Sequence, residues 1–197
     1  MFHQVPVLPV LVPLAAVAFA ALLWVLLRRG LFSLPRAALA LAFCVYLVGI
    51  AANTIFPIFL DKPRTSAPWS AFLTLVPLAG YEVADAVTNI LVFVPLGMLV
   101  PLLAARPTWW RTVMVAAFVS LGIEVVQYVT AHLLGGGHIA DVNDLIFNVV
   151  GGAVGYGVLV LVTRVPAGAT LVDRFRWHGA AARDTESAAV PVELVGL

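Results

Sequence analysis

Long apolar runs alternate with short polar segments along most of the chain. Five such runs can be separated, and they lie at roughly residues 10–27, 37–60, 88–105, 111–134 and 145–163. A helix that crosses a membrane needs about 20 mostly apolar residues, and each run comes close to or exceeds that length. The pattern therefore predicts an all-α fold, a polytopic membrane bundle of about five transmembrane helices.

The composition favours a membrane protein over a soluble one. Of the 197 residues, 62% are hydrophobic and 11% are charged, and the mean hydropathy is +1.05. Ordinary soluble domains are roughly half apolar and about a quarter charged. The formal net charge of +1 gives no sign of a nucleic-acid partner, so we expect an integral membrane protein without one.

The transmembrane runs form one predicted domain, residues 1–163, whose part 37–163 carries the motifs described below. Beyond this domain the regular apolar pattern ends, and we expect residues 164–197 to form a cytoplasmic tail that is largely disordered. Within the tail, Leu171 and Phe175 could form the apolar face of a short helix on the inner leaflet.

Basic residues are distributed unevenly between the predicted loops. Nine of the 11 lie in segments 28–36, 106–111 and 164–183, which fall on one side of the membrane. The other side holds only Lys62 and Arg64. Because loops rich in Lys and Arg stay in the cytoplasm, we expect the N-terminus outside and the C-terminus inside.

The first apolar run is preceded and interrupted by Pro6, Pro9 and Pro13. Proline is tolerated in the first turn of a helix and disruptive further in, so we expect the first helix to start near Pro13. No basic residue precedes the run, which favours a retained helix over a cleaved signal peptide.

The longest loop, residues 61–87, lies on the predicted outer side. It mixes turn residues with aromatic ones such as Trp69 and Tyr81. Because Trp and Tyr favour the headgroup level of a membrane, we expect an interfacial or partly re-entrant segment that packs over the bundle.

Polar residues from four predicted helices converge on the outer half of the membrane. Glu124 lies about 13 residues into its outward-running helix, which is about 20 Å into a core of about 30 Å, and Gln127 lies one turn further out. A carboxyl group at such depth costs roughly 2.5–3.5 kcal/mol on insertion scales and is a functional-site candidate by default. The predicted ligand-binding set is Asn53, Asn89, Glu124, Gln127, His138, Asp141, Asp144 and Asn148.

Several of these residues also have structural interpretations. Asp141 or Asn143 can cap the fifth helix, and Asn89 can cap the third. Asn53 can make a single hydrogen bond between helices. Capping cannot explain Glu124, because it lies in mid-helix, so its carboxyl group needs a partner, a proton or a ligand.

A second group of residues is predicted to act structurally. Gly151, Gly155 and Gly157 suit close packing between helices rather than contact with a ligand. Residues four positions apart share one face of a helix, which places Phe93 and Gly97 together. The predicted structural set is Phe93, Pro95, Gly97, Gly151 and Gly155.

Three motifs in fixed order resemble the VanZ-like family of bacterial membrane proteins. They are Asn-Ile-Leu-Val-Phe-Val-Pro-Leu-Gly at 89–97, Glu-Val-Val-Gln at 124–127 and Asp-Val-Asn-Asp-Leu-Ile-Phe-Asn-Val-Val-Gly at 141–151. The resemblance covers about residues 37–163. It implies a small helical bundle in the bacterial cytoplasmic (inner) membrane, with polar motif residues near the outer face. The best-known member of the family is associated with low-level resistance to the glycopeptide antibiotic teicoplanin.

Two positions depart from the family pattern. The family usually has an arginine three residues before the first aspartate, where this chain has His138, and it often has asparagine where this chain has Thr74. Histidine is charged only when its pKa is raised, so this position holds a phosphate or carboxylate less firmly than arginine would.

Three hypotheses for the function stay open from the sequence. The first is an outward-facing pocket that binds or modifies a lipid, a lipid-linked cell-envelope precursor or an acylated glycopeptide, and so contributes to teicoplanin-type resistance. The second is a membrane-embedded hydrolase or transferase in which Glu124, Asp141 or Asp144 acts as acid or base, or holds Mg²⁺ or Ca²⁺. The third is a proton-coupled transporter with Glu124 as the relay. No cofactor is expected, because the candidate site lacks the histidines and cysteines that zinc prefers.

Overall fold

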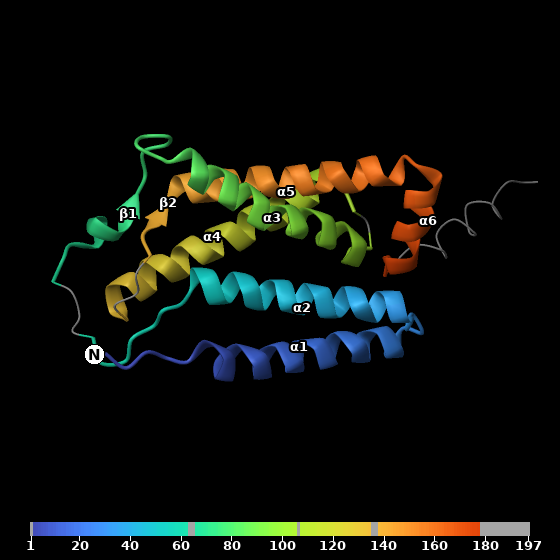
Figure 1. The fold of residues 1–197 in the computed structure, drawn as a ribbon, viewed down its shortest axis with the longest axis horizontal. Helices are drawn as coiled ribbons and strands as arrows, with labels where there is room; N and C mark the ends of the chain where they lie inside the picture. The colour runs from blue at the N-terminus through green and yellow to red at the C-terminus, as the bar shows by residue number, and fades with distance from the viewer. Residues whose placement is uncertain (1, 63–65, 106, 135–137, 178–197) are drawn as a thin grey trace, which may run out of the picture.

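The protein is a bundle of long helices that run side by side (Figure 1). The computed structural model describes residues 2–62, 66–105, 107–134 and 138–177. The long helices are α1 (Val7–Arg28), α2 (Leu34–Thr54), α3 (Val83–Leu103), α4 (Trp109–Leu133) and α5 (Val142–Thr163). All five are long and apolar enough to cross a membrane, which confirms the predicted all-α fold within the described part of the chain. Three of the arginines that were counted to predict the membrane orientation lie outside the described residues: Arg64, Arg106 and Arg183.

All five long helices begin before the predicted apolar runs, and two of them begin at least five residues before their predicted starts. The first begins at Val7 and not near Pro13, which lies inside α1. Pro9 falls in the first turn, where backbone N–H groups have no partner within the helix, so only Pro13 removes a helical hydrogen bond. The third begins at Val83, five residues before the predicted start, with Asp85 in its first turn. An acidic residue there meets the positive end of the helix dipole, which favours the early start.

Helices α3 and α5 form the tightest contact in the bundle. A Cβ atom added to Gly97 would overlap the backbone of Gly152, and one added to Gly155 would overlap the carbonyl oxygen of Val94. Gly151 approaches the backbone of α3 in the same way, whereas a Cβ on Gly157 would meet nothing. The structure thus places the predicted glycines Gly97, Gly151 and Gly155 between helices, but Gly157 faces open space.

One end of the bundle is closed by apolar packing. A short helix, α6 (Pro166–Phe175), lies across this end, and Trp177 beyond it is only 5% exposed. Trp177 joins a buried apolar cluster with Leu26, Leu39 and Ala40, and its backbone N–H donates to the carbonyl oxygen of Leu102 at 3.0 Å. Ordered structure therefore continues past the predicted domain boundary at residue 163, because buried apolar surface continues to Trp177. Residues 178–197 lie outside the described part.

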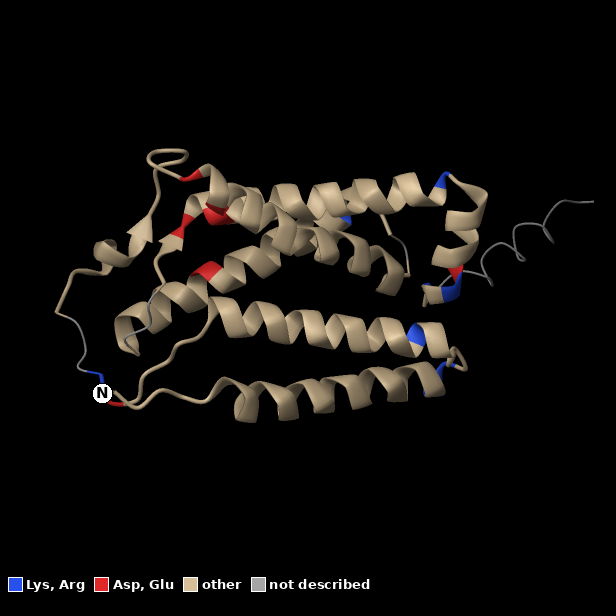
Figure 2. Cartoon of the chain, viewed as in Figure 1, with Lys and Arg blue, Asp and Glu red and all other residues tan. Residues whose placement is uncertain are grey.

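The two ends of the bundle differ in the charged residues that they carry, and we call them the basic end and the acidic end (Figure 2). The basic end carries α6 and most of the described arginines. Arg28 is the last residue of α1, Arg36 lies in the first turn of α2, and Arg164 is the C-cap of α5. The acidic end carries the start of α3, the end of α4 and the start of α5, with Asp141 and Asp144. Such segregation leaves the middle parts of α1, α2, α3 and α5 uncharged, as a spanning bundle requires, whereas α4 carries Glu124 within its length.

The long loop packs over the acidic end. It contains a 3₁₀ turn, η1 (Trp69–Phe72), followed by strand β1 (Leu73–Thr74), which pairs in parallel with β2 (Ala140–Asp141). Trp69 stacks on His132 of α4, with ring centroids 3.6 Å apart. The strand pair ties the loop to the start of α5, directly beside the predicted site.

Candidate functional site

A polar hollow, the central cleft, lies among α2, α3, α4 and α5 toward the acidic end. Its volume is about 650 Å³. Seven of the eight residues predicted to bind a ligand line it, and the eighth, Asp141, lies just outside it. The seven are Asn53, Asn89, Glu124, Gln127, His138, Asp144 and Asn148. The structure thus brings together side chains that are up to 95 positions apart in the sequence (from 53 to 148).

Glu124 is held by a backbone group of the segment that precedes α5. Its Oε2 accepts a hydrogen bond from the backbone N–H of Asp141 at 2.8 Å, and the side chain is only 8% exposed. Glu124 lies four residues after the fully buried Ser120, so both occupy the inward face of α4. The mid-helix carboxyl group therefore has a structural partner, which its position in the sequence did not reveal.

Asp141 caps α5, as one interpretation of the sequence proposed. Its Oδ1 accepts hydrogen bonds from the backbone N–H and from Nδ2 of Asn143, both at 2.8 Å. Asn143 is fully buried, and its Oδ1 accepts the backbone N–H of Leu78 at 2.7 Å. Leu78 has a φ of 62°, a left-handed conformation that is rare for leucine. The cap therefore also fixes a strained turn of the long loop against the site.

Asn89, Tyr81 and Asp144 form a hydrogen-bonded triad at the edge of the central cleft, which Asn89 and Asp144 line. Nδ2 of Asn89 donates to the Tyr81 hydroxyl oxygen and to Oδ1 of Asp144, each at 2.6 Å, and the Tyr81 hydroxyl donates to the same Oδ1 at 2.5 Å. The Tyr81 ring stacks on Phe147, with centroids 5.4 Å apart. Burial and the hydrogen bond to Asp144 raise the pKa of the Tyr81 hydroxyl, so it remains a donor.

The predicted cap role of Asn89 is wrong, because α3 begins six residues earlier, at Val83. Asn89 therefore lies in the second turn, where its side chain is available to the triad. The predicted interhelical hydrogen bond of Asn53 is also wrong: its Nδ2 donates to the carbonyl oxygen of Gly49, one turn back in α2. His138 lies within hydrogen-bond distance of the Phe56 carbonyl oxygen, with Nε2 at 3.1 Å.

Two buried amides line the deeper part of the central cleft. Nδ2 of Asn148 donates to Oγ of Ser120 at 2.9 Å, which links α5 to α4. Oδ1 of Asn148 and Oε1 of Gln127 are buried without a hydrogen-bond partner in the described structure. In native proteins nearly all buried polar atoms have a hydrogen-bond partner, so these two oxygens indicate that a hydrogen-bond donor binds in the cleft.

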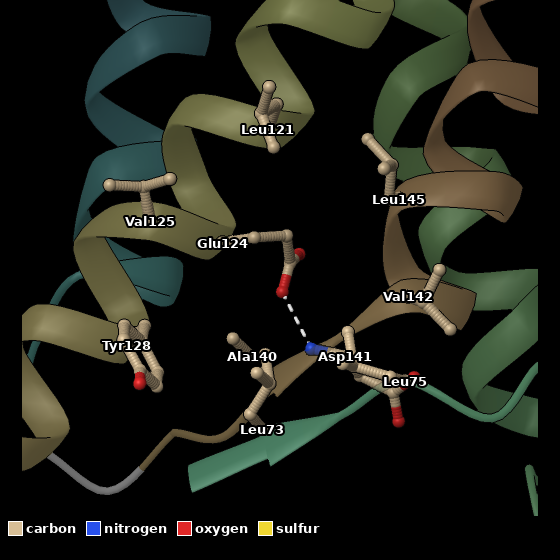
Figure 3. Close-up of a pocket in the computed structure, with 10 residues that line it drawn as sticks. All are labelled: Leu73, Leu75, Leu121, Glu124, Val125, Tyr128, Ala140, Asp141, Val142 and Leu145. Carbon is tan, nitrogen blue, oxygen red and sulfur yellow. Dashed lines mark hydrogen bonds between the residues drawn. The ribbon is translucent and has the colours of Figure 1, made fainter. Parts of the chain in front are cut away.

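Beside the central cleft lies a smaller lateral pocket of about 190 Å³ between α4, α5 and β1 (Figure 3). Glu124 points into it from α4 and reaches toward the backbone N–H of Asp141. Nearly all other side chains of its lining are apolar: Leu73, Leu75, Leu121, Val125, Tyr128, Ala140, Val142 and Leu145. Because Glu124 borders both hollows, its carboxylate separates a polar space from an apolar one.

A third hollow, the acidic mouth, has a volume of about 380 Å³ and opens at the start of α3 and α5. It shares Thr88, Asn89 and Asp144 with the central cleft. Glu82, Asp85 and Asp141 supply further carboxylates to its lining. Among the described residues, no three His, Cys, Asp or Glu side chains are grouped so as to hold a metal ion.

Sequence reasoning missed three side chains of the site: Tyr81, Ser120 and Asn143. Ser120 lies one turn before Glu124 on the same helix face, and Asn143 lies inside the motif at 141–151, so spacing could have indicated both. Tyr81 carries no such signal, because it reaches the cleft only through the path of the long loop.

A family model described as VanZ/LLP1 matches residues 43–163, which is more than half of the chain. The matched segment runs from α2 to the end of α5 and includes every residue that lines the central cleft. Comparisons with curated proteins and with solved structures gave no match.

Proposed function

Since the chain belongs to the VanZ/LLP1 family and is a multi-pass protein of the bacterial inner membrane, we propose that its central cleft binds a membrane lipid or a lipid-linked precursor of the cell envelope. One observation carries this proposal. A polar cleft and an apolar pocket meet at a single buried carboxylate, that of Glu124. Polar groups fix the orientation of a ligand, while apolar walls supply most of the contact, and an amphiphile matches both.

We infer that this cleft faces the outer leaflet of the membrane. The described arginines gather at the basic end, and loops rich in basic residues stay in the cytoplasm. The acidic end would then face the side where lipid-linked envelope precursors are used. Fusing green fluorescent protein or alkaline phosphatase to the C-terminus tests this orientation. A fluorescent fusion and an inactive phosphatase support it, and the opposite pair of results contradicts it.

Binding of a lipid-like ligand would link the protein to glycopeptide resistance of the teicoplanin type. Teicoplanin-type glycopeptides carry an acyl chain, which the apolar lateral pocket beside Glu124 suits. We therefore expect expression of the gene to raise resistance to acylated glycopeptides more than to glycopeptides without the chain. Equal susceptibility to both types, with and without the gene, would contradict this link.

The binding function itself is tested on purified protein. Lipids that co-purify with the wild type and with Asp144→Asn are identified by mass spectrometry. Asp144 is a better position than Asp141 for this test, because Asp141 caps α5 whereas Asp144 lines the cleft. The matched control is Asp61→Asn, since Asp61 lies at the same end but lines none of the three hollows.

We expect a lipid species that is retained by the wild type and by Asp61→Asn and is lost from Asp144→Asn. If all three proteins carry the same lipids in the same amounts, the cleft is not the binding site.

A further inference from the structure

Carboxyl groups line the central cleft and the acidic mouth, and among the described lining residues the basic side chain beside them is that of His138. Glu124 and Asp144 line the cleft, and Glu82, Asp85 and Asp141 join Asp144 in the mouth. Among the described residues that line either hollow, none is a lysine or an arginine. A ligand whose innermost group was a phosphate or carboxylate would meet like charges here, which oppose binding, whereas a cationic group that precedes a phosphate would not. The distribution of charge therefore favours a cationic group.

The unpaired oxygens of the cleft are a second, independent observation that favours a ligand with a hydrogen-bond donor such as a cationic group. Oε1 of Gln127 and Oδ1 of Asn148 have no hydrogen-bond donor, although the two side chains are only 6% and 5% exposed. Both line the central cleft beside Glu124 and Asp144. All four groups are oxygen acceptors, so the missing partner is a hydrogen-bond donor.

An apolar chain can reach the same place from the bilayer. Leu121 and Val125 line the lateral pocket on α4 and are 48% and 52% exposed, so the pocket borders the surface of the spanning region. Glu124 lines both that pocket and the central cleft. A ligand bound there would have a donor group at one end and a hydrocarbon chain at the other.

Resting on the proposed binding function, we propose that the ligand is a membrane lipid whose head group ends in a primary ammonium. An ammonium has three N–H donors and no acceptor, which suits a cleft that offers only acceptors at its unpaired positions. The ammonium enters between Glu124 and Asp144, within the polar cleft that Gln127 and Asn148 line. The acyl chain leaves past Glu124 along the lateral pocket.

The test uses the full chain in detergent and three lipids with identical acyl chains. Dioleoyl phosphatidylethanolamine carries the ammonium, its N-acetyl derivative lacks that charge, and dioleoyl phosphatidylglycerol lacks nitrogen. Binding is measured by native mass spectrometry. Because hydrogen bonds to charged groups are the strong ones, we expect phosphatidylethanolamine to bind about tenfold more tightly than either other lipid.

Variants test whether the preference for phosphatidylethanolamine arises in the cleft. Asp144→Asn is expected to lose most of this preference, and Asp173→Asn at the basic end is expected to retain it. Because Asp144 also holds Tyr81 and Asn89, a second variant avoids buried contacts: Glu82→Gln combined with Asp85→Asn, which changes two exposed side chains of the mouth. This double variant should bind phosphatidylethanolamine more weakly, while its melting temperature falls only slightly because Asp85 no longer meets the positive end of the α3 dipole.

The outcomes separate this inference from the binding function. Tight binding of phosphatidylglycerol or of the N-acetyl lipid that depends on Asp144 would overturn the ammonium inference and leave the binding function in place. A wild-type protein that binds none of the three lipids and carries none from the membrane would overturn both.

Discussion

The two ends of this bundle are built from similar apolar helices but are finished in opposite ways. At the basic end, Leu26, Leu39, Ala40 and Trp177 pack together, and Arg36 donates hydrogen bonds to the carbonyl oxygens of Leu31 and Arg176. At the acidic end, the space between the helices holds polar side chains around a cleft of about 650 Å³. A fold that fills one end with hydrocarbon can fill the other, so the open polar end indicates function rather than a failure of packing.

The side chains of the acidic end are held in place by hydrogen bonds, although a cleft remains between them. Glu124, Asp141, Asn143 and Asp144 all accept or exchange hydrogen bonds with defined partners. Among the described residues that line the cleft, the buried side-chain atoms without a hydrogen-bond partner are Oε1 of Gln127 and Oδ1 of Asn148. The arrangement resembles a preorganised site more closely than a path for ions, and the apolar cluster at the basic end favours a binding site over a transport route.

The largest expected loss of stability comes from disrupting the contact between α3 and α5, two helices that run through both ends of the bundle. Gly155→Leu would force side-chain atoms into the backbone of Val94 on α3 and is expected to cost at least about 3 kcal/mol, the upper end of ordinary overpacking. Gly157→Leu is the matched control, since a Cβ there meets nothing. Thermal unfolding and size-exclusion profiles in detergent check both. Similar losses in the two variants would show that α3 and α5 are not in close contact.

The next prediction tests whether the basic end can be destabilised without a change in lipid binding at the acidic end. Trp177→Ala removes a large buried side chain from the basic end and is expected to lower stability by about 3–5 kcal/mol. Because the cleft lies at the other end, the variant should still carry the same co-purified lipid as the wild type, at a temperature where it remains folded. Loss of that lipid without unfolding would show that the two ends are coupled.

A smaller effect is expected at the acidic end from Asn143→Ala. The change removes the acceptor of the Leu78 backbone N–H, and because Leu78 is exposed to solvent the lost hydrogen bond is expected to cost about 0.5–1.5 kcal/mol. The turn around Leu78 should then exchange amide hydrogens faster, while α6 should not. Hydrogen exchange followed by mass spectrometry measures both regions. Unchanged exchange at the turn would mean that Asn143 does not hold the loop.

The smallest effect concerns pH at the surface of the acidic end. The backbone N–H and ring of His3 lie 2.6 and 2.7 Å from the carboxylate of Asp61, and these contacts lower the pKa of Asp61. A lowered pKa means that the contact stabilises the fold above the ordinary aspartate value of about 3.9 and is lost as pH falls through the lower, folded value. Amide exchange near His3 should rise in that acidic window. Asp61→Asn should abolish this rise, and the same rise in Asp61→Asn as in the wild type would contradict the assignment.

The sequence predicted the bundle because five apolar runs leave few other solutions for the backbone in a membrane. It also predicted that Asn53, Glu124 and Asp144 share a layer, because depth follows from counting residues along a helix. Helix starts were less predictable, since Pro13 is tolerated inside α1 and Asp85 favours an early start of α3. Those shifts decided whether Asn89 would cap a helix or face the cleft.

Contacts made by loops could not be predicted from spacing. Tyr81 reaches Asp144 only because β1 pairs with β2 and because Asn143 binds the turn at Leu78. The partner of Glu124 is likewise a backbone N–H, which every residue carries and no motif marks. Side-chain identity therefore indicated which residues belong to the site, and the loop path decided what each one contacts.

The most direct measurement is a cryo-electron microscopy structure of the protein extracted with its native lipids into nanodiscs, with an antibody fragment bound for size. We expect elongated density that begins in the central cleft between Glu124 and Asp144 and continues along the lateral pocket. The apolar cluster around Trp177 should contain no such density. A cleft that is closed by its own side chains, with the oxygens of Gln127 and Asn148 bonded to protein donors, would contradict a ligand site at the acidic end.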